Sequence, residues 1–150
     1  MTVNFKIIPS PEGYRVALPV PATAGSAGLD LSACIDAPVT IQPGEIRMIP
    51  SGLAAEIPSG YVGLVFGRSG LGTKFGVTLA NSVGVIDSDY RGELRVSLIN
   101  RGSAPYTVEQ GERIAQLVIM PYAAVTPVEA ESLEETERGE RGFGSTGRHN

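Results

Sequence analysis

Short apolar runs, separated by glycine, proline and polar turn residues, recur along the chain. Runs of about four to eight residues that are apolar, or that alternate between apolar and polar, are typical of β-strands. No segment sustains the period of about 3.6 residues that marks an amphipathic helix. The pattern therefore predicts an all-β fold, either a sandwich or a barrel. We expect strands at residues 5–8, 14–18, 27–34, 46–49, 53–57, 61–66, 76–80, 83–86, 94–99 and 113–120.

Three local features refine this prediction. Residues 61–66 are apolar enough to form a strand that is buried on both faces. Residues 67–72 are rich in glycine and are expected to form a loop that opens a single helical turn. Asn81 and Ser82 are expected to form the turn of a hairpin that joins residues 76–80 to residues 83–86.

The composition changes after Pro127. Residues 129–140 are acidic and contain few large apolar side chains, so they should not pack into a core. The last residues are rich in glycine, and glycine-rich termini are often disordered. We therefore expect a β-barrel domain at residues 1–127 and a flexible C-terminal tail at residues 128–150.

Length and charge exclude several classes of protein. The chain has 150 residues, which is enough for one domain with a real core. Its formal net charge of -4 argues against direct nucleic-acid binding, which needs a basic surface. No apolar run approaches the roughly 20 residues of a membrane-spanning helix, and the N-terminus lacks the features of a signal peptide. With one cysteine, Cys34, and one histidine, His149, the chain can form neither an internal disulfide nor a zinc site. We expect a cytoplasmic protein that binds no membrane.

The scarcity of histidine and cysteine also makes a carboxylate the expected catalytic base. Asp87 is the best placed candidate, because it lies in G-V-I-D-S-D-Y-R-G-E (84–93), where an apolar run meets turn residues. The other interpretation of this stretch is a polar β-turn, since Asp and Ser side chains bond to nearby backbone amides. Asp30 and Gln116 are polar residues within strand-like runs, and a solvent-facing position would explain them equally well.

Two glycine-rich segments carry groups that bind phosphate. Residues 67–72 combine backbone amides, the Arg68 guanidinium and the Ser69 hydroxyl. Residues 142–147, G-F-G-S-T-G, repeat this chemistry near the C-terminus, and Phe143 can stack on a planar ligand. The simpler interpretations are a flexible connection between strands and a disordered tail.

Five segments of the chain, listed at the end of this paragraph, together resemble the five motifs of the trimeric dUTP diphosphatases (dUTPases), in the order in which that family carries them. The resemblance covers nearly the whole chain, and five motifs in register are highly specific. Two positions depart from the family pattern: Gly67 stands where the family usually has proline, and Arg141 where it usually has glycine. Neither departure removes a functional group. The five segments are A-G-L-D-L-S-A (27–33), R-S-G-L-G-T-K (68–74), G-V-I-D-S-D-Y-R-G-E (84–93), G-E-R-I-A-Q-L (111–117) and R-G-E-R-G-F-G-S-T-G (138–147).

The resemblance implies a jelly-roll-like β-barrel that forms a homotrimer. It also implies hydrolysis of dUTP to dUMP and pyrophosphate by attack of water on the α-phosphorus, which limits uracil incorporation into DNA and supplies dUMP for dTTP synthesis. Mg²⁺ would be bound mainly by the substrate phosphates and reached by Asp30 through water. Asp87, as the base, would be catalytic together with Gln116 and Arg138. The implied substrate-binding residues are Arg68, Ser69, Gly70, Asn81, Gly84, Val85, Ile86, Tyr90, Arg138, Phe143, Gly144, Ser145 and Thr146.

The same resemblance implies that each site is shared between subunits. One chain would supply Arg68, Ser69 and Gln116. Asp87 would come from the next chain, and the tail that closes over the site from the third. Asn81 and the backbone around it would match the hydrogen-bonding edge of uracil. Tyr90 would pack beneath the sugar and leave no room for a 2′-hydroxyl.

Two other functions fit the sequence. A dCTP deaminase, or a bifunctional enzyme that makes dUMP from dCTP, has the same fold, although the motifs look like those of the hydrolase. A non-enzymatic jelly-roll binding module is the other alternative, but it has no reason to carry Asp87 beside two phosphate-binding segments. Pyrophosphate release from dUTP and from dCTP distinguishes the three functions.

Overall fold

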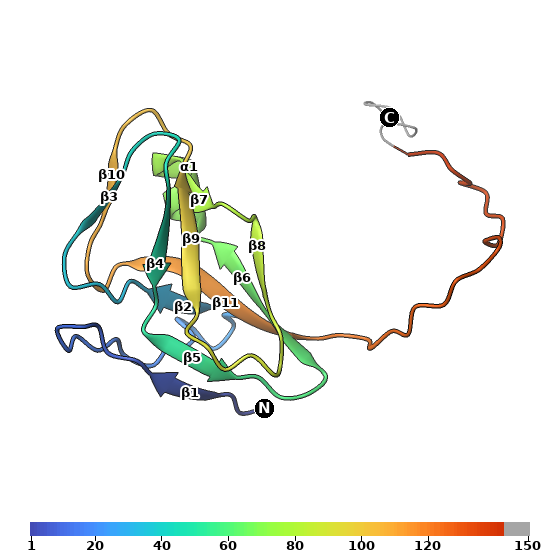
Figure 1. Cartoon of the computed structure of the whole chain (residues 1–150), viewed down its shortest axis with the longest axis horizontal. Helices are drawn as coiled ribbons and strands as arrows, with labels where there is room; N and C mark the ends of the chain where they lie inside the picture. Colours follow the sequence, from blue (N-terminus) through green and yellow to red (C-terminus); the bar gives the residue numbers. More distant parts are fainter. Residues whose placement is uncertain (143–150) are drawn as a thin grey trace.

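Antiparallel β-strands joined by tight turns make up most of the regular structure in residues 1–142, which are the residues that the computed structural model describes (Figure 1). The one helix in this part of the chain is short. The prediction of an all-β fold is therefore confirmed. The elements are β1 (Asn4–Ile7), β2 (Leu29–Ser32), β3 (Val39–Ile41), β4 (Ile46–Pro50), β5 (Leu53–Glu56), β6 (Tyr61–Gly67), α1 (Ser69–Phe75), β7 (Val77–Leu79), β8 (Val83–Ile86), β9 (Arg95–Asn100), β10 (Tyr106–Val108) and β11 (Arg113–Pro121).

The strands form two larger sheets that share one hydrophobic core. The four-stranded sheet has the order β2-β11-β6-β8, and the three-stranded sheet has the order β4-β9-β7. The pairs β1-β5 and β10-β3 form two further ribbons. Leu117 of the first sheet and Leu98 of the second are both fully buried in the same cluster of side chains. Alternation along each strand places such residues inward and their neighbours outward.

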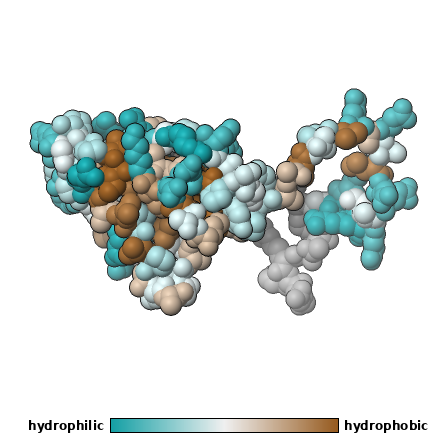
Figure 2. Space-filling view, turned by 90° about the horizontal axis from the view of Figure 1, so that it is seen from below, coloured by the Kyte–Doolittle hydropathy of each residue, from teal (hydrophilic) through white to brown (hydrophobic). Residues whose placement is uncertain are grey.

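The outward face of the four-stranded sheet is also apolar. Residues directly opposite each other on antiparallel strands lie on the same face, and Val85 is opposite Leu64, which is opposite Val118. Figure 2 shows hydrophobic residues (brown) at the surface of the barrel. Within the described chain this face, here called the outer sheet face, is exposed or half-buried. It comprises Val62, Leu64, Phe66, Val83, Val85, Val118 and Met120.

The burial of β6 therefore differs from the expectation for residues 61–66. Gly63 and Val65 point into the core and are buried, whereas Val62, Leu64 and Phe66 are only half-buried. The strand is apolar on both faces, but the described chain covers only one of them.

The expected hairpin around Asn81 is wrong. β7 pairs with β9 in the three-stranded sheet, while β8 pairs with β6 in the four-stranded sheet. The chain thus crosses from one sheet to the other at residues 80–82. Ser82, with φ 64°, is the one non-glycine residue with positive φ among residues 1–142, and it lies at this crossing.

One expected strand is absent, and two strands are present that were not expected. Residues 14–18 form no strand, although Val16 packs into the core. β3 and β10 were not expected, because each has only three residues with a threonine in the centre. They are stabilised by pairing with each other, and the central residues Thr40 and Thr107 are hydrogen-bonded through their hydroxyls at 2.9 Å.

Helix α1 is longer than the single turn expected from the sequence. Glycines are poor helix formers, and α1 contains two, Gly70 and Gly72. Burial of Leu71 anchors the helix to the core. Its end is capped by Gly76, which adopts the left-handed conformation at φ 72° and donates its N–H to the carbonyl of Gly72 at 3.1 Å.

Residues 121–142 are exposed along their whole length, and beyond Tyr122 the chain extends away from the barrel (Figure 1, orange to red). Their composition accounts for this, since acidic and small side chains bury little apolar surface. A division of the chain into a domain and a tail at residue 127 stays a prediction. No helix in residues 1–142 has the length and apolar character needed to cross a membrane.

Candidate active site

A polar cluster lies where β2, β11 and β6 meet at one end of the four-stranded sheet. Gly67, the last residue of β6, pairs with Ala115 of β11, and Arg68 follows it directly. The next residue of β11, Gln116, pairs with Asp30 of β2. The register of three strands therefore brings together polar residues from three of the five motif segments.

Asp30 lies between two guanidinium groups. Nε of Arg68 donates to Oδ1 at 3.1 Å, and Nη1 of Arg113 donates to Oδ2 at 3.0 Å. Arg68 also donates to the backbone carbonyl of Arg113 at 3.2 Å. Two cations beside one carboxylate leave excess positive charge, which favours binding of phosphate oxygens. The side chains of Asp30 and Arg68 are 28% and 29% exposed, so a ligand can reach both of them.

Gln116 is held beside the phosphate-binding segment. Its Nε2 donates to the carbonyl of Gly67 at 3.3 Å. A Cβ at Gly28 would lie 2.8 Å from Oε1 of Gln116, so a larger residue there would displace the amide. Ser69 and Gly70 follow Arg68 directly in the sequence, and both are exposed in the first turn of α1. The arrangement can bind several oxygens of a phosphate chain.

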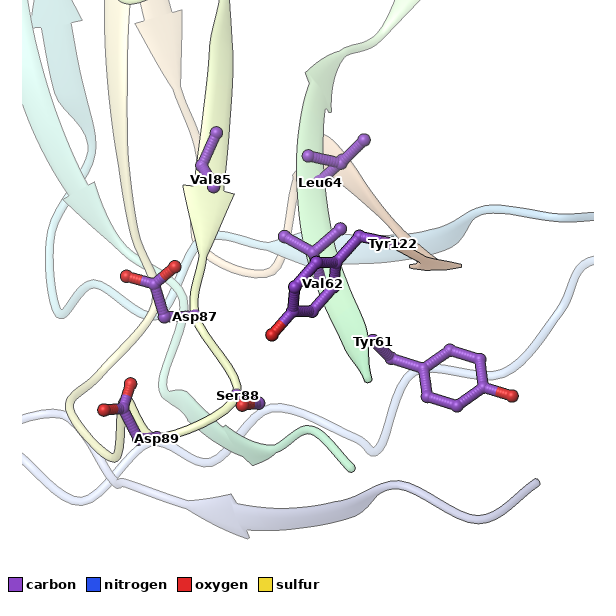
Figure 3. Close-up of a pocket in the computed structure, with 8 residues that line it drawn as sticks. All are labelled: Tyr61, Val62, Leu64, Val85, Asp87, Ser88, Asp89 and Tyr122. Carbon is purple, nitrogen blue, oxygen red and sulfur yellow. The ribbon is translucent and has the colours of Figure 1, made fainter. Parts of the chain in front are cut away.

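Asp87 lies near the other end of the sheet, directly after β8. The N–H of Tyr90 donates to the carbonyl of Asp87 at 3.1 Å and closes a turn. Asp87 is among the residues around a hollow of about 640 Å³, in which apolar side chains of β6 lie opposite the turn (Figure 3). This hollow is lined by Tyr61, Val62, Leu64, Val85, Asp87, Ser88, Asp89 and Tyr122.

The residues expected to contact the nucleoside lie along or beside β8. Asn81 is exposed at the crossing between the sheets, and a Cβ at Gly84 would lie 3.7 Å from its Nδ2. The Tyr90 hydroxyl donates to the carbonyl of Glu93 at 3.1 Å. A Cβ at Gly92 would lie 2.3 Å from that hydroxyl oxygen, so the ring requires glycine there. Val85 is exposed and Ile86 half-buried on the same strand.

One chain does not bring Asp87 and the polar cluster together. Ile86, the residue before Asp87, pairs with Gly63, and Arg68 lies five residues further along the extended strand. At about 3.3 Å per residue, Arg68 is about 17 Å along the strand from Gly63, the position beside which Asp87 lies. A general base must lie within hydrogen-bond reach of the proton that it accepts. Asp87 therefore cannot serve the polar cluster of its own chain.

Comparison with known proteins decides the family. A model of the dUTPase family matches residues 15–147. The chain belongs to the dUTPase family. A relative from Burkholderia cenocepacia, named deoxyuridine 5'-triphosphate nucleotidohydrolase, is 51% identical over 150 residues, which are 99% of this chain and 100% of the relative. A relative of the same name from Alcanivorax borkumensis is 48% identical over 149 residues, or 99% of each chain.

A solved structure agrees with this assignment. The Staphylococcus bacteriophage 80alpha dUTPase with dUPNHPP is 30% identical, with a TM-score of 0.85 over 97% of this chain and 98% of that chain. The resemblance drawn from the five motifs is therefore confirmed, as are the jelly-roll-like β fold and the expectation of an enzyme.

The described part of the fifth motif segment of this dUTPase, residues 138–142, lies in the exposed tail. Nε of Arg138 donates to the carbonyl of Arg141 at 3.0 Å, and Nε of Arg141 donates to the carbonyl of Arg138 at 3.0 Å. These contacts are local, and the tail extends away from the barrel (Figure 1). The expected substrate-binding residues Phe143, Gly144, Ser145 and Thr146 lie outside the described residues.

Arg113 was not among the site residues expected from the sequence. Strict alternation along β11 would point it to the opposite face from Gln116. The register shifts between Arg113 and Ala115, however, and such a β-bulge re-aims a side chain. Arg113 thereby reaches Asp30. The one feature of the sequence that indicates a role for Arg113 at the site is its position, as a cation, within the motif segment at residues 111–117.

Tyr106 and Glu112 support the same region and were also not expected. The Tyr106 hydroxyl donates to the Glu112 carboxylate, just before β11 begins. Burial, and then the hydrogen bond to Glu112, raise the pKa of Tyr106 above its ordinary value, so the phenol stays a hydrogen-bond donor at a pH where a free tyrosine ionises. Its ring packs against Phe75, at the end of α1, with the centroids 5.0 Å apart. Tyr106 thus links the end of α1 to the start of β11.

The residues around Asp30 fit a metal ion that arrives with its substrate. Residues 1–142 contain no group of three or more His, Cys, Asp and Glu side chains that could hold a metal. Mg²⁺ is commonly bound by one or two carboxylates together with substrate phosphates. Asp30, accessible and beside Arg68, is a carboxylate that would suit such a metal ion.

Proposed function

We propose that this member of the dUTPase family hydrolyses dUTP to dUMP and pyrophosphate, with Mg²⁺ bound mainly by the substrate phosphates. The observation that carries the proposal is the arrangement along the four-stranded sheet. Phosphate-binding groups around Arg68 lie at one end, the Asp87 carboxylate lies at the other, and the apolar outer sheet face extends between them. The names of the bacterial relatives support the choice of substrate.

In the proposed reaction, Asp87 accepts a proton from a water molecule whose oxygen attacks the α-phosphorus. The bond from the α-phosphorus to the oxygen shared with the β-phosphorus breaks, and pyrophosphate leaves with the electron pair. The phosphate chain is held by Arg68, Ser69 and Gln116, of which Ser69 and Gln116 lie nearest the reacting phosphorus. Arg138 adds positive charge from the tail. Positioning and charge stabilisation supply most of the rate.

Mg²⁺ would neutralise and orient the three phosphates when bound. Asp30 would hold it through metal-bound water. The contacts of Arg68 and Arg113 support this role, because each of them binds a different oxygen and together they fix the orientation of the carboxylate.

A homotrimer with shared sites would resolve the separation of about 17 Å along the sheet. Packing of the outer sheet face against a second chain would cover its apolar side chains, as is usual in permanent assemblies. It would also bring Asp87 of one subunit to the polar cluster of the next. The tail, at residues 128–150, would reach the site from the third subunit.

Selection of uracil would depend on the segment from Asn81 to Tyr90. Asn81 and the backbone of Gly84, Val85 and Ile86 would match the two carbonyls and the N3–H of uracil. Cytosine reverses this pattern at N3 and C4 and would leave buried polar groups unpaired. Tyr90 would pack beneath the deoxyribose and exclude a 2′-hydroxyl.

The tail would act as a lid over the bound nucleotide. Phe143 would stack on the base, and Gly144, Ser145 and Thr146 would bind phosphate oxygens. Closing a lid of this kind excludes water and completes a catalytic site.

A cytoplasmic location is proposed from the single cysteine. Cys34 is free and 2% exposed. Burial raises the pKa of its thiol, which makes it a poor nucleophile. A reducing compartment, where disulfides are rare, fits such a residue.

Comparison of kcat/KM for dUTP, dCTP, dTTP and UTP, each with and without Mg²⁺, tests the proposed function. We expect a strong preference for dUTP, dependence on Mg²⁺, and release of pyrophosphate. Similar constants for dUTP and dCTP would contradict the proposed base recognition. Release of ammonia from dCTP would identify a deaminase, and no turnover of any nucleotide would identify a binding module.

A further inference from the structure

Arg91 follows the turn that carries Asp87, and its guanidinium binds back onto that turn. Nη1 donates to the carbonyl of Ser88 at 2.7 Å and to the carbonyl of Tyr90 at 3.0 Å. These two carbonyls flank Asp89, so one rigid, planar group spans the turn. Residues 87–94 belong to no strand, and the side-chain contacts of Arg91 therefore add order where no sheet ladder does.

The guanidinium is also tied to the barrel. Its Nη2 lies 3.7 Å from Oε1 of Glu56, the last residue of β5. The other carboxylate oxygen of Glu56 accepts a hydrogen bond from Nδ2 of Asn4 at 2.9 Å. Asn4 and Glu56 face each other across the paired strands β1 and β5. A chain of polar contacts thus leads from this ribbon, through Glu56 and Arg91, to the turn.

Stability alone does not explain these contacts. The side chains of Arg91 and Glu56 are 54% and 55% exposed. Ion pairs with this exposure contribute little to the stability of a fold. The contacts do fix the path of the backbone directly after Asp87, which matters for a group that must be aimed at a reacting atom.

We propose that Arg91 is a positioning residue for the reaction: it holds the turn that aims the Asp87 carboxylate, and Glu56 orients Arg91. This inference rests on the proposed function, in which Asp87 is the general base. Displacement of a catalytic group by about 1 Å can cost roughly 10²-fold in rate. Arg91 acts through backbone carbonyls and need not touch the substrate. Its loss should therefore lower kcat more than it lowers nucleotide affinity, which depends largely on the phosphate-binding groups at the other end of the sheet.

The test compares Arg91→Ala with Arg47→Ala in the full-length protein. Arg47 is a matched control, because its side chain is also 54% exposed and ion-paired, with Glu45 at 2.6 Å. Arg91→Ala should lower kcat roughly 10- to 100-fold, while the Kd for dUPNHPP changes by less than about three-fold. Hydrogen exchange of the amides at residues 87–92 should become faster. Arg47→Ala should change none of these quantities.

Two more variants define the mechanism of positioning. Arg91→Lys should restore only part of kcat, because an ammonium group lacks the planar fork that reaches two carbonyls and a carboxylate together. Glu56→Gln should lower kcat less than Arg91→Ala does, because the contacts from Arg91 to the turn remain. Full activity of Arg91→Lys would show that charge alone suffices and would contradict the proposed geometry.

Several results would overturn the inference. One is a kcat for Arg91→Ala equal to that of Arg47→Ala. Another is a lower unfolding temperature with unchanged kcat per site, counted by titration with dUPNHPP, because this would indicate a purely structural role. Asp87→Asn, measured in parallel, separates the proposed role of Asp87 as the base from the proposed role of Arg91 in positioning it. If Asp87→Asn is active, the proposed base is wrong and the inference fails with it. If Asp87→Asn is inactive and Arg91→Ala behaves like the control, only the role of Arg91 is wrong.

Discussion

Arg68 donates a hydrogen bond from its Nε to Oδ1 of Asp30 at 3.1 Å, so a guanidinium proposed to bind phosphate is paired with a carboxylate of its own chain. The Asp30 carboxylate offsets part of the positive charge of Arg68 and Arg113, and so weakens the attraction of a triphosphate to this cluster. A divalent cation between the phosphates and Asp30 would compensate for that negative charge. The pair therefore links nucleotide affinity to Mg²⁺.

Asp30→Asn tests this link. Without Mg²⁺, the variant should bind dUPNHPP roughly three- to ten-fold more tightly than the natural chain does, because one nearby negative charge is removed. The gain in affinity on adding Mg²⁺ should shrink. Calorimetric titration with and without Mg²⁺ measures both effects, and an unchanged gain would show that Asp30 takes no part in metal binding.

Asp87→Asn should retain binding of dUPNHPP but lose roughly 10²–10⁴ in kcat, the usual contribution of a general base. Asparagine keeps the shape of the side chain and can hold water, but it cannot accept the proton. With the natural chain in ¹⁸O-labelled water, the label should appear in dUMP. Label in pyrophosphate would mean attack on the β-phosphorus and would contradict the proposed mechanism.

Sharing of the site between subunits predicts that two inactive variants complement each other. Asp87→Asn lacks the base, and a chain truncated after Glu137 lacks the end of the tail. If the base and the tail of each site come from different subunits, about a quarter of the sites in randomly mixed trimers contain both intact. Co-refolding should therefore restore activity that neither variant has alone. Mixed trimers confirmed by native mass measurement, but without activity, would show that each chain supplies both groups to its own site.

Gly52→Ala and Gly44→Ala separate backbone strain from steric overlap. Both glycines have positive φ, at 66° and 79°, and the left-handed conformation costs a residue with a Cβ about 1–2 kcal/mol. A Cβ at Gly52 would lie 2.6 Å from Sγ of the buried Cys34, whereas a Cβ at Gly44 would meet nothing within 4 Å. Gly52→Ala should therefore be less stable than Gly44→Ala by about a further 1–3 kcal/mol.

Urea unfolding followed by circular dichroism, at equal protein concentrations, gives the two stabilities. Equal losses would mean that Cys34 moves aside at no cost and that the core around it is not tightly packed.

The strand pattern could be predicted wherever apolar runs are long enough to carry their own signal. Nine of the ten segments expected as strands contain a strand, among them residues 61–66 and 113–120. β3 and β10 could not be predicted, because three residues around a threonine carry no distinctive pattern and depend on a partner far along the chain. Sheet partners also depend on tertiary structure. Nothing local indicates that β7 and β8, only three residues apart, join different sheets.

The polar residues of the site could be identified from the sequence because each belongs to a motif segment. Their mutual contacts could not. Arg113 reaches Asp30 through a β-bulge that alternation does not predict. Arg91 contacts the turn that follows β8 and also Glu56 at the end of β5. Such contacts depend on register and backbone direction, which several segments determine jointly.

The order of the four-stranded sheet has a consequence during synthesis. β11, the last strand in residues 1–142, lies between β2 and β6. A growing polypeptide on the ribosome therefore cannot join these two strands until Pro121 has been made. Until then, both strand edges are open to incorrect pairing with other chains, which is the hazard of unpaired strands. Pairings between distant segments also form slowly. The four-stranded sheet can therefore be completed only after all of β11 has been made, and the edges of β2 and β6 that it covers stay open until then.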